Sequence, residues 1–337
     1  MTEDEEAIVG FKPDEEVIAP IRSAVRPYHV PTEAYVRPCT AIADEALASD
    51  GVFKSLADRY AVLTTELPLA GSAMLRTNTA GEIALIARLR AAAPWLEPAI
   101  ASIERSLRIQ NWAGRPWIAW RPLCLTGPPG CGKSHLARLI GDLAGTGDAT
   151  LDLAGTSDNR TLEGTARGWT STQPCWPALV MSQTRTANPV LVLEEVEKAG
   201  GSARNGNPLA TLLTMIEAET AASFWDKCLL AEVDLSHACW ILTCNHADLL
   251  PPVLRSRLDI VAVEGPGPEH FDFVASAIVA NLVRQWGIAP TALPTLPPRA
   301  FSVLRNAFAR TRSVRTLRRH LEQVIAAMIP HVRDRTH

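Results

Sequence analysis

The stretch Leu123-Cys-Leu-Thr-Gly-Pro-Pro-Gly-Cys-Gly-Lys-Ser134 decides the fold of this chain. It begins with three apolar residues that predict a short buried strand, and it then turns through glycine and proline. The turn, Gly127–Ser134, matches the pattern G-x-x-x-x-G-K-[ST]. An amphipathic helix is predicted next, because apolar residues recur at helical spacing: Leu136, Leu139, Ile140 and Leu143. A strand, this turn and a helix in that order predict a loop that binds phosphate groups.

The chemistry of the turn predicts that it binds ATP together with Mg²⁺. Its glycines let backbone N–H groups turn inward toward phosphate oxygens, and the positive end of the following helix faces the same anion. Lys133 is expected to reach the β- and γ-phosphates, and the Ser134 hydroxyl is expected to bind the metal. The predicted nucleotide contacts are Gly127, Pro128, Pro129, Gly130, Cys131, Gly132, Lys133, Ser134 and His135.

A second motif, Val190-Leu-Val-Leu-Glu-Glu195, is an apolar strand that ends in two carboxylates. Phosphoryl transfer to water needs one carboxylate for the Mg²⁺ shell and another as general base. We assign Glu194 to the metal and Glu195 to the base. The usual residue at the first position is Asp, and the extra methylene of Glu194 moves its carboxylate by more than about 1 Å. Because Mg²⁺ geometry is strict, hydrolysis is expected to be slow while binding is retained.

The rest of the chain predicts three regions. Short apolar runs at 190–193, 240–242 and 260–263 alternate with helical or loop segments, which indicates a parallel sheet covered on both faces. After Pro266 the strands stop, and helices are predicted at 271–286, 300–309 and 314–329. Prolines recur through the first 38 residues, and helical periodicity follows at 80–93 and 96–109. The predicted boundaries are 1–115, partly irregular and partly helical; 116–266, the α/β unit; and 267–337, a helical lid.

Composition excludes several classes of protein. The 337 residues are 47% hydrophobic and 20% charged, as in ordinary globular proteins, and the net charge of −3 gives no global basic field for nucleic acid. Seven cysteines without a C-x-x-C pair predict neither a disulfide framework nor a zinc site, so a reducing cytoplasm is expected. No signal peptide and no apolar run of membrane-spanning length is present. The basic stretch 310–319 keeps a DNA-acting alternative open.

These motifs together resemble the ATPase module of Lon proteases and their AAA+ relatives. The resemblance covers roughly residues 117–330, and its motifs occur in the family's order. They are 123–134, Gly155 to Gly164, Trp169 to Pro174, Asn188-Pro-Val-Leu-Val-Leu-Glu-Glu-Val-Glu-Lys198, Asp234-Leu-Ser236, Thr243-Cys-Asn245, Leu254-Arg-Ser-Arg-Leu258 and Ser313-Val-Arg315.

The resemblance implies a five-stranded parallel AAA+ sheet and further site residues. Asn245 matches the sensor-1 residue that orients the attacking water. Arg257 matches the arginine finger that completes a neighbouring subunit's site, with Arg255 as the alternative. Arg315 matches sensor-2, which contacts the γ-phosphate. Trp169 matches a pore-loop aromatic that grips an extended polypeptide.

The function implied is ATP hydrolysis by a ring, expected to be a homohexamer, that remodels, unfolds or disassembles a protein substrate. The N-terminal region is expected to bind the substrate or an adaptor. No protease activity is expected, because the Lon peptidase domain has no room behind the helical unit. A nucleotide-gated assembly switch with slow turnover is the alternative that Glu194 favours. Binding to nucleic acid is not favoured, and no membrane association is expected.

Overall fold

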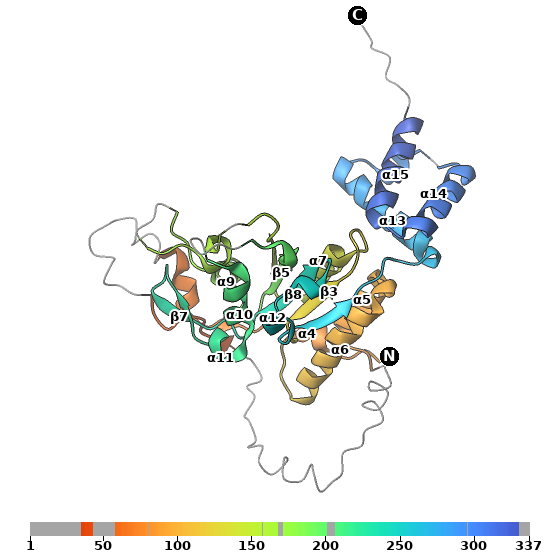
Figure 1. Cartoon of the computed structure of the whole chain (residues 1–337). Coiled ribbons are helices and arrows are strands. Elements are labelled where there is room, and N and C mark those ends of the chain that lie inside the picture. The colour runs from red at the N-terminus through yellow and green to blue at the C-terminus, as the bar shows by residue number, and fades with distance from the viewer. Residues whose placement is uncertain are drawn as a thin grey trace, which may run out of the picture. The chain divides into compact units, whose positions relative to one another are not determined.

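The computed structural model of the chain describes residues 35–42, 58–79, 81–156, 158–167, 171–200, 206–294 and 296–329 (Figure 1). The chain divides into two compact units, Met1–Thr32 and Glu33–His337, and all the described residues belong to the second. None of the helices in the described part combines the length and the apolar character that crossing a membrane requires.

A five-stranded parallel sheet forms the centre of the α/β unit. Its strands are β3 (Leu123–Thr126), β4 (Asp148–Asp152), β5 (Val190–Glu194), β8 (Cys239–Cys244) and β9 (Asp259–Ala262), in the order β4-β5-β8-β3-β9. The three inner strands are buried along almost their whole length, which explains their uninterrupted apolar sequence. All the ladders are parallel, so the carboxyl ends of the strands meet at one edge. The predicted fold class is confirmed.

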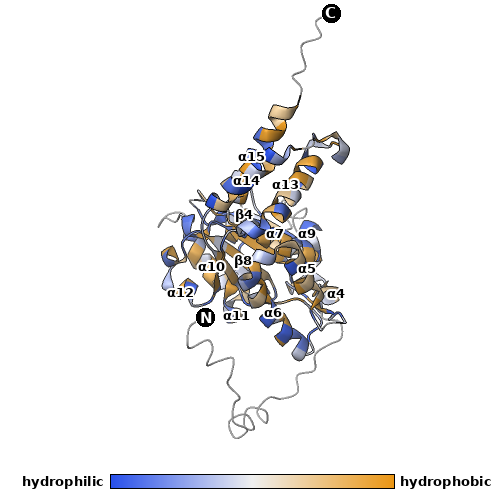
Figure 2. Cartoon of the chain, turned by 90° about the vertical axis from the view of Figure 1, so that its right-hand side faces the viewer, coloured by the Kyte–Doolittle hydropathy of each residue, from blue (hydrophilic) through white to orange (hydrophobic). Residues whose placement is uncertain are grey.

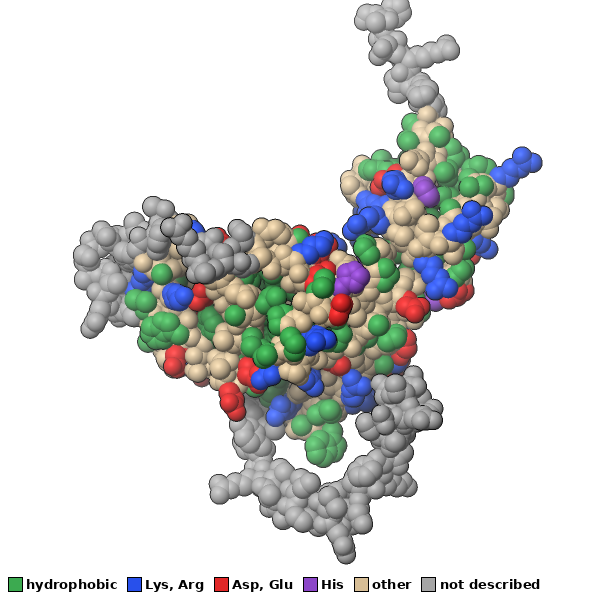
Figure 3. Space-filling model, in the orientation of Figure 1, with side chains coloured by type: hydrophobic (Ala, Val, Ile, Leu, Met, Phe, Trp, Pro, Cys, Tyr) green, Lys and Arg blue, Asp and Glu red, His purple; other side chains and the backbone are tan. Residues whose placement is uncertain are grey.

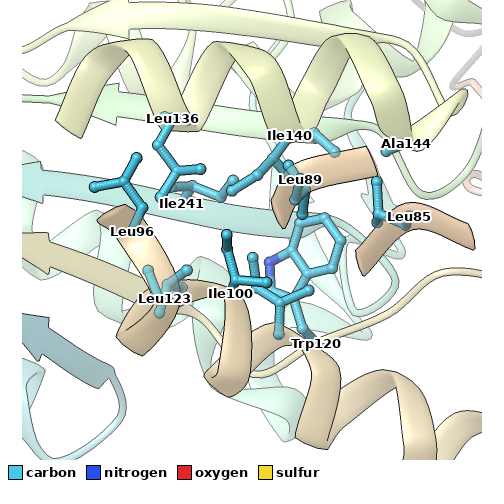
Figure 4. Close-up of a cluster of buried hydrophobic side chains, with 14 of the residues drawn as sticks. Leu85, Leu89, Leu96, Ile100, Trp120, Leu123, Leu136, Ile140, Ala144 and Ile241 are labelled. Atoms are coloured by element: carbon cyan, nitrogen blue, oxygen red, sulfur yellow. The ribbon is translucent and has the colours of Figure 1, made fainter. Parts of the chain in front are cut away.

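Helices that precede the sheet in sequence pack into its main core. Helices α5 (Ala84–Ala92) and α6 (Glu97–Trp112) share one hydrophobic cluster with α7 (Lys133–Ala144) and the strands β3 and β8. Figure 4 shows Leu89 and Ile100 from the first two helices facing Leu136 and Ile140 from α7. The domain boundary predicted near residue 115 therefore divides elements that share a core.

Asn188, just before β5, ties this N-terminal part to the sheet. Its side chain is completely buried, accepts a hydrogen bond from the Ala70 amide at 2.7 Å, and donates to the carbonyls of Ala70 and Ile118 at 3.0 Å.

The remaining strands and α-helices of this part of the chain are β1 (Tyr35–Val36), β2 (Leu67–Pro68), α4 (Ser72–Leu75), α8 (Arg160–Glu163), α9 (Trp176–Thr184), α10 (Pro208–Ile216), α11 (Ala218–Ala221), β6 (Phe224–Asp226), β7 (Ala231–Val233) and α12 (Pro252–Arg255).

The helical lid consists of α13 (Phe271–Trp286), α14 (Pro298–Thr311) and α15 (Val314–Met328). Its helices carry hydrophobic residues among hydrophilic ones, as Figure 2 shows, and the apolar residues form a separate core cluster. Trp95, between α5 and α6, packs against both this cluster and the main core. Its ring lies 5.6 Å from that of His270 and 5.9 Å from that of Phe273, so one tryptophan joins the two cores.

Candidate nucleotide-binding site

The phosphate-binding loop runs from the end of β3 to the start of α7. A Cβ atom on Gly127 would lie 2.2 Å from the Val263 carbonyl oxygen, so a side chain cannot be accommodated there. A Cβ atom on Gly130 would lie 2.8 Å from Oγ of Ser313, the residue that precedes helix α15 of the lid. Both glycines therefore allow the backbone of the loop to pack closely between β9 and α15.

Lys133, the first residue of α7, points back into the loop. Its buried ammonium group donates to the carbonyl oxygens of Gly127 at 2.6 Å and Pro128 at 3.0 Å, and to Asn245 Oδ1 at 3.1 Å. An ammonium has three donors, so phosphate binding has to replace at least one of these contacts. The lysine is already beside the residue predicted as sensor-1.

A cavity of about 300 Å³ opens beside this lysine. Four cationic residues line it against one carboxylate, which suits a polyphosphate. Burial lowers the pKa of His135, with Arg138 acting in the same direction, so the imidazole there is neutral at pH 7. The described residues that line the cavity are Pro129, Gly130, Gly132, Lys133, Ser134, His135, Arg138, Glu195, Thr243, Cys244, Asn245, Val314, Arg315 and Arg318.

Three predicted contact residues do not belong to the described lining of this cavity. Gly127 and Pro128 act through their carbonyl groups on Lys133, and Cys131 is buried with its sulfur 3.9 Å from Lys133 Nζ. Pro128 and Cys131 line a neighbouring cavity of about 460 Å³ with Glu264 and residues at the end of α14. These residues shape the loop, and their contact with the nucleotide stays a prediction.

Glu194, the last residue of β5, offers a carboxylate oxygen for a metal ion. Its Oε1 atom is buried and has no hydrogen-bond partner among the described residues. A buried, unsatisfied carboxylate oxygen is unfavourable, and a cation is the ligand that would satisfy it. The donor set of Glu194 and the Ser134 hydroxyl fits Mg²⁺, which takes one or two protein oxygens together with phosphate and water.

Glu195 adopts a left-handed backbone conformation with φ 54° and reaches the cavity. Its amide donates to Thr243 Oγ1 at 3.3 Å, and its Oε2 accepts from Lys198 Nζ at 2.7 Å. Lys198 ends the 3₁₀ turn Val196–Lys198. Both side chains are exposed, so this ion pair is weak and does not prevent Glu195 from turning toward a water molecule.

Asn245 follows β8 and is positioned by a residue that the sequence left without a role. Its amide donates to Glu197 Oε1 at 2.8 Å, while its side chain accepts from Lys133. Glu197 lies 48 residues away in the sequence. The only signal for it was a third carboxylate close behind Glu194 and Glu195.

The lid contributes Arg315 through the first turn of α15. Ser313 caps this helix by accepting from the Thr316 amide at 3.2 Å, and the Val314 amide donates to the Gly130 carbonyl at 3.2 Å. These bonds fix the start of α15 against the phosphate-binding loop. Arg315 consequently lines the cavity, as the sensor-2 prediction requires.

Arg257 does not belong to the described lining of the cavity. It follows α12, and its side chain is 40% exposed. Its guanidinium forms an ion pair with Glu217 and donates to Ser256 Oγ at 2.8 Å. Arg255, the alternative finger, has a buried Nε without a hydrogen-bond partner among the described residues.

Trp169 lies outside the described residues, and its pore-loop role stays a prediction.

Comparison with known proteins agrees with this architecture. A sequence profile of the "ATPase family associated with various cellular activities (AAA)" matches residues 123–264. Lon protease 2 of Myxococcus xanthus is 30% identical over 211 residues, which are 62% of this chain and 25% of that protein. The mitochondrial Lon protease homolog of Caenorhabditis elegans is 28% identical over 211 residues, 62% of this chain and 22% of that protein. The chain spans about a quarter of the length of these curated relatives.

One of the solved structures to which the chain is similar, with a TM-score of 0.57 and 16% identity, is "Closed State CryoEM Reconstruction of Hsp104:ATPyS and FITC casein". The match covers 72% of this chain and 46% of that one, and at this identity it supports the fold alone. The family profile and the Lon matches coincide with the strands and the loop that build the cavity. Residues 123–264 are therefore similar to the AAA ATPase family, and 62% of the chain is similar to part of the Lon proteases, around a cavity whose residues fit ATP and Mg²⁺.

Proposed function

We propose that this chain hydrolyses ATP in an oligomeric ring and couples hydrolysis to remodelling, unfolding or disassembly of a protein substrate. One observation carries the proposal. The cavity beside Lys133 contains Glu195, Asn245 and Arg315, whereas Arg257 is exposed elsewhere. A site that lacks its arginine finger within one chain needs a second chain to supply it.

Each residue of the site has one role in the binding or hydrolysis of ATP. Backbone amides of the loop and Lys133 bind the phosphates; Ser134 and Glu194 would hold Mg²⁺, which would neutralise phosphate charge there. Glu195 removes a proton from the attacking water, and Asn245 orients that water. Arg315 brings a positive charge from the lid to the γ-phosphate, so the state of the nucleotide affects the lid.

The surface around Arg257 supports contact with a second copy of the chain. Val253, whose carbonyl accepts from Arg257 at 3.5 Å, is 52% exposed, and Leu249, which precedes it on the same stretch of chain, is 62% exposed. Exposed apolar side chains beside a functional charge are typical of a protein interface. We propose a hexamer as the closed assembly, with a protein substrate threaded past Trp169.

The N-terminal region is proposed to select the substrate or an adaptor. The cytoplasm is the proposed compartment, because all seven cysteines are free and buried, as expected in a reducing environment. The structure of the Hsp104 relative was determined with casein, so labelled casein is a suitable first probe for remodelling.

Subunit mixing tests the proposal. Arg257→Ala is expected to lower kcat by about 10³-fold or more without loss of ATP binding, since a finger in trans contributes about 10³–10⁵ in rate. Lys133→Ala should be inactive, because its ATP binding is expected to be weaker by about 100-fold or more. Mixed rings should recover activity, because Lys133→Ala subunits supply intact fingers to Arg257→Ala sites. A mixture as inactive as its components, or concentration-independent ATPase activity of a wild-type monomer, would contradict a ring with shared sites.

A nucleotide-gated switch with slow turnover is the second candidate. Glu194 in place of Asp favours slow hydrolysis, because Mg²⁺ geometry is strict. The DNA-acting alternative has less support. Many lid side chains are basic, as Figure 3 shows, but Arg315 lines the nucleotide cavity, and Arg318 bonds Glu322 at 3.0 Å and Asn281 at 3.3 Å. These contacts favour roles within the protein.

A further inference from the structure

We propose that Glu217 positions Arg257, so that the arginine enters a neighbouring subunit's nucleotide site in one defined orientation. This inference rests on the proposed function, because it concerns the same finger. Glu217 belongs to none of the motifs that identify the domain, and it lies 40 residues before Arg257 in the sequence.

The guanidinium of Arg257 is held on two of its nitrogens. Nε donates to a carboxylate oxygen of Glu217, and Nη1 donates to Ser256 Oγ at 2.8 Å and to the Val253 carbonyl at 3.5 Å. Nη2 has no hydrogen-bond partner within the described residues. A planar guanidinium whose orientation is set by two nitrogens keeps donors on the third for a phosphate oxygen. This is the arrangement of a positioned cation rather than of a fully sequestered one.

Glu217 is itself firmly placed. It connects α10 to α11, and its backbone belongs to both helix ends. Its amide donates to the Leu213 carbonyl at 3.2 Å, and its carbonyl accepts from the Ala221 amide at 2.8 Å. Leu212 and Met215 anchor α10 in the protein interior. The carboxylate therefore projects from a rigid junction, which makes it a suitable support for a long, flexible arginine side chain.

The ion pair joins two separate parts of the fold. Glu217 directly follows α10 (Pro208–Ile216), and Arg257 lies on the connection between α12 and β9. Glu217 therefore ties the position of the finger to the end of α10.

Glu217→Ala tests the inference, with Glu219→Ala as matched control. Glu219 is exposed, lies two residues further on α11, and has no ion pair within the described residues. We expect Glu217→Ala to lower kcat about fivefold, the upper range for an exposed pair, with KM for ATP unchanged. Glu217→Gln should retain part of the rate, because its amide oxygen still accepts from Nε. The control should equal wild type.

Complementation separates positioning from general damage. Glu217→Ala subunits have an intact nucleotide site and an impaired finger, so mixing with Lys133→Ala should raise the rate per intact site toward wild type. In the Arg257→Ala background, Glu217→Ala should have no further effect. A wild-type kcat for Glu217→Ala, an increased kcat, or a loss that mixing does not restore would overturn the role of Glu217. If Arg257→Ala itself is not rescued by Lys133→Ala, the shared site fails instead.

Discussion

The phosphate-binding loop and the corner around Arg257 are built in opposite ways. At the loop, Lys133 is buried, its three donors are used, and parts of four separate segments converge on one cavity. At the corner, Arg257 is 40% exposed, is held by Glu217, and is flanked by exposed apolar residues. The nucleotide site at the loop is nearly complete within one chain, whereas the corner around Arg257 exposes a charged side chain and apolar side chains on the surface.

This difference separates binding from turnover. Interior hydrogen bonds and close backbone packing fix the loop within one chain, so we expect a single chain to bind ATP. An exposed arginine adds nothing to its own site, so any contribution to rate depends on a neighbour. Substitutions at the loop should therefore affect binding, and substitutions at the corner should affect turnover and its dependence on assembly.

The largest effect on ATP binding is expected from a substitution in the phosphate-binding loop. Lys133→Ala removes a charged donor from the phosphates, and it should weaken ATP binding by about 100-fold or more, as charge-assisted hydrogen bonds require. Isothermal titration calorimetry at matched protein concentration measures this directly. Arg257→Ala serves as control and should bind ATP as wild type does. Equal binding by both variants would remove the distinction between the two regions.

A second substitution sharpens the contrast inside the binding region. Glu194→Asp shortens the side chain that is assigned to Mg²⁺, and turnover should rise about tenfold if the extra methylene misplaces the metal, which corresponds to about 1.4 kcal/mol in the barrier. Steady-state ATPase rates at saturating Mg²⁺ provide the measurement, and ATP affinity should change little. A decrease in rate would show that the backbone already compensates for Glu194.

The smallest effect is expected where the lid meets the loop. Ser313→Ala removes the cap of α15 and should lower the free energy of unfolding by about 1 kcal/mol, without abolishing ATP binding. Urea denaturation followed by circular dichroism is the measurement. Ser302→Ala, an exposed position inside α14, is the control and should change stability by less than about 0.5 kcal/mol. A Ser313→Ala variant as stable as the control would argue against the cap.

Much of the fold could be predicted because its elements carry strong local patterns. Helix α13 was predicted at residues 271–286 and has those bounds, since its apolar periodicity is sustained and Gly287 ends it. Strand β4 was not located. Its sequence, Asp148-Ala-Thr-Leu-Asp152, is polar at both ends because it lies at the edge of the sheet and is only partly buried. The hairpin of β6 and β7 was also missed, because each strand has only three residues.

The same difference between local patterns and distant contacts decides which residues of the candidate site could be predicted. Residues within a contiguous motif, such as Lys133 and Glu195, were predicted because the spacing itself encodes their chemistry. The partners Glu197 and Glu217 were not, because their bonds to Asn245 and Arg257 span 48 and 40 residues. No local pattern shows which strand ends and helix junctions meet in space, so these supporting contacts required the structure.

The bond between the Val314 amide and the Gly130 carbonyl joins two main-chain atoms. Exchange of the side chain at position 314 leaves this bond in place, and only proline there lacks the donor. At position 130 the left-handed backbone and the nearby Ser313 hydroxyl restrict the residue to glycine. The attachment of α15 to the turn therefore tolerates substitution on the side of the lid and excludes it on the side of the loop.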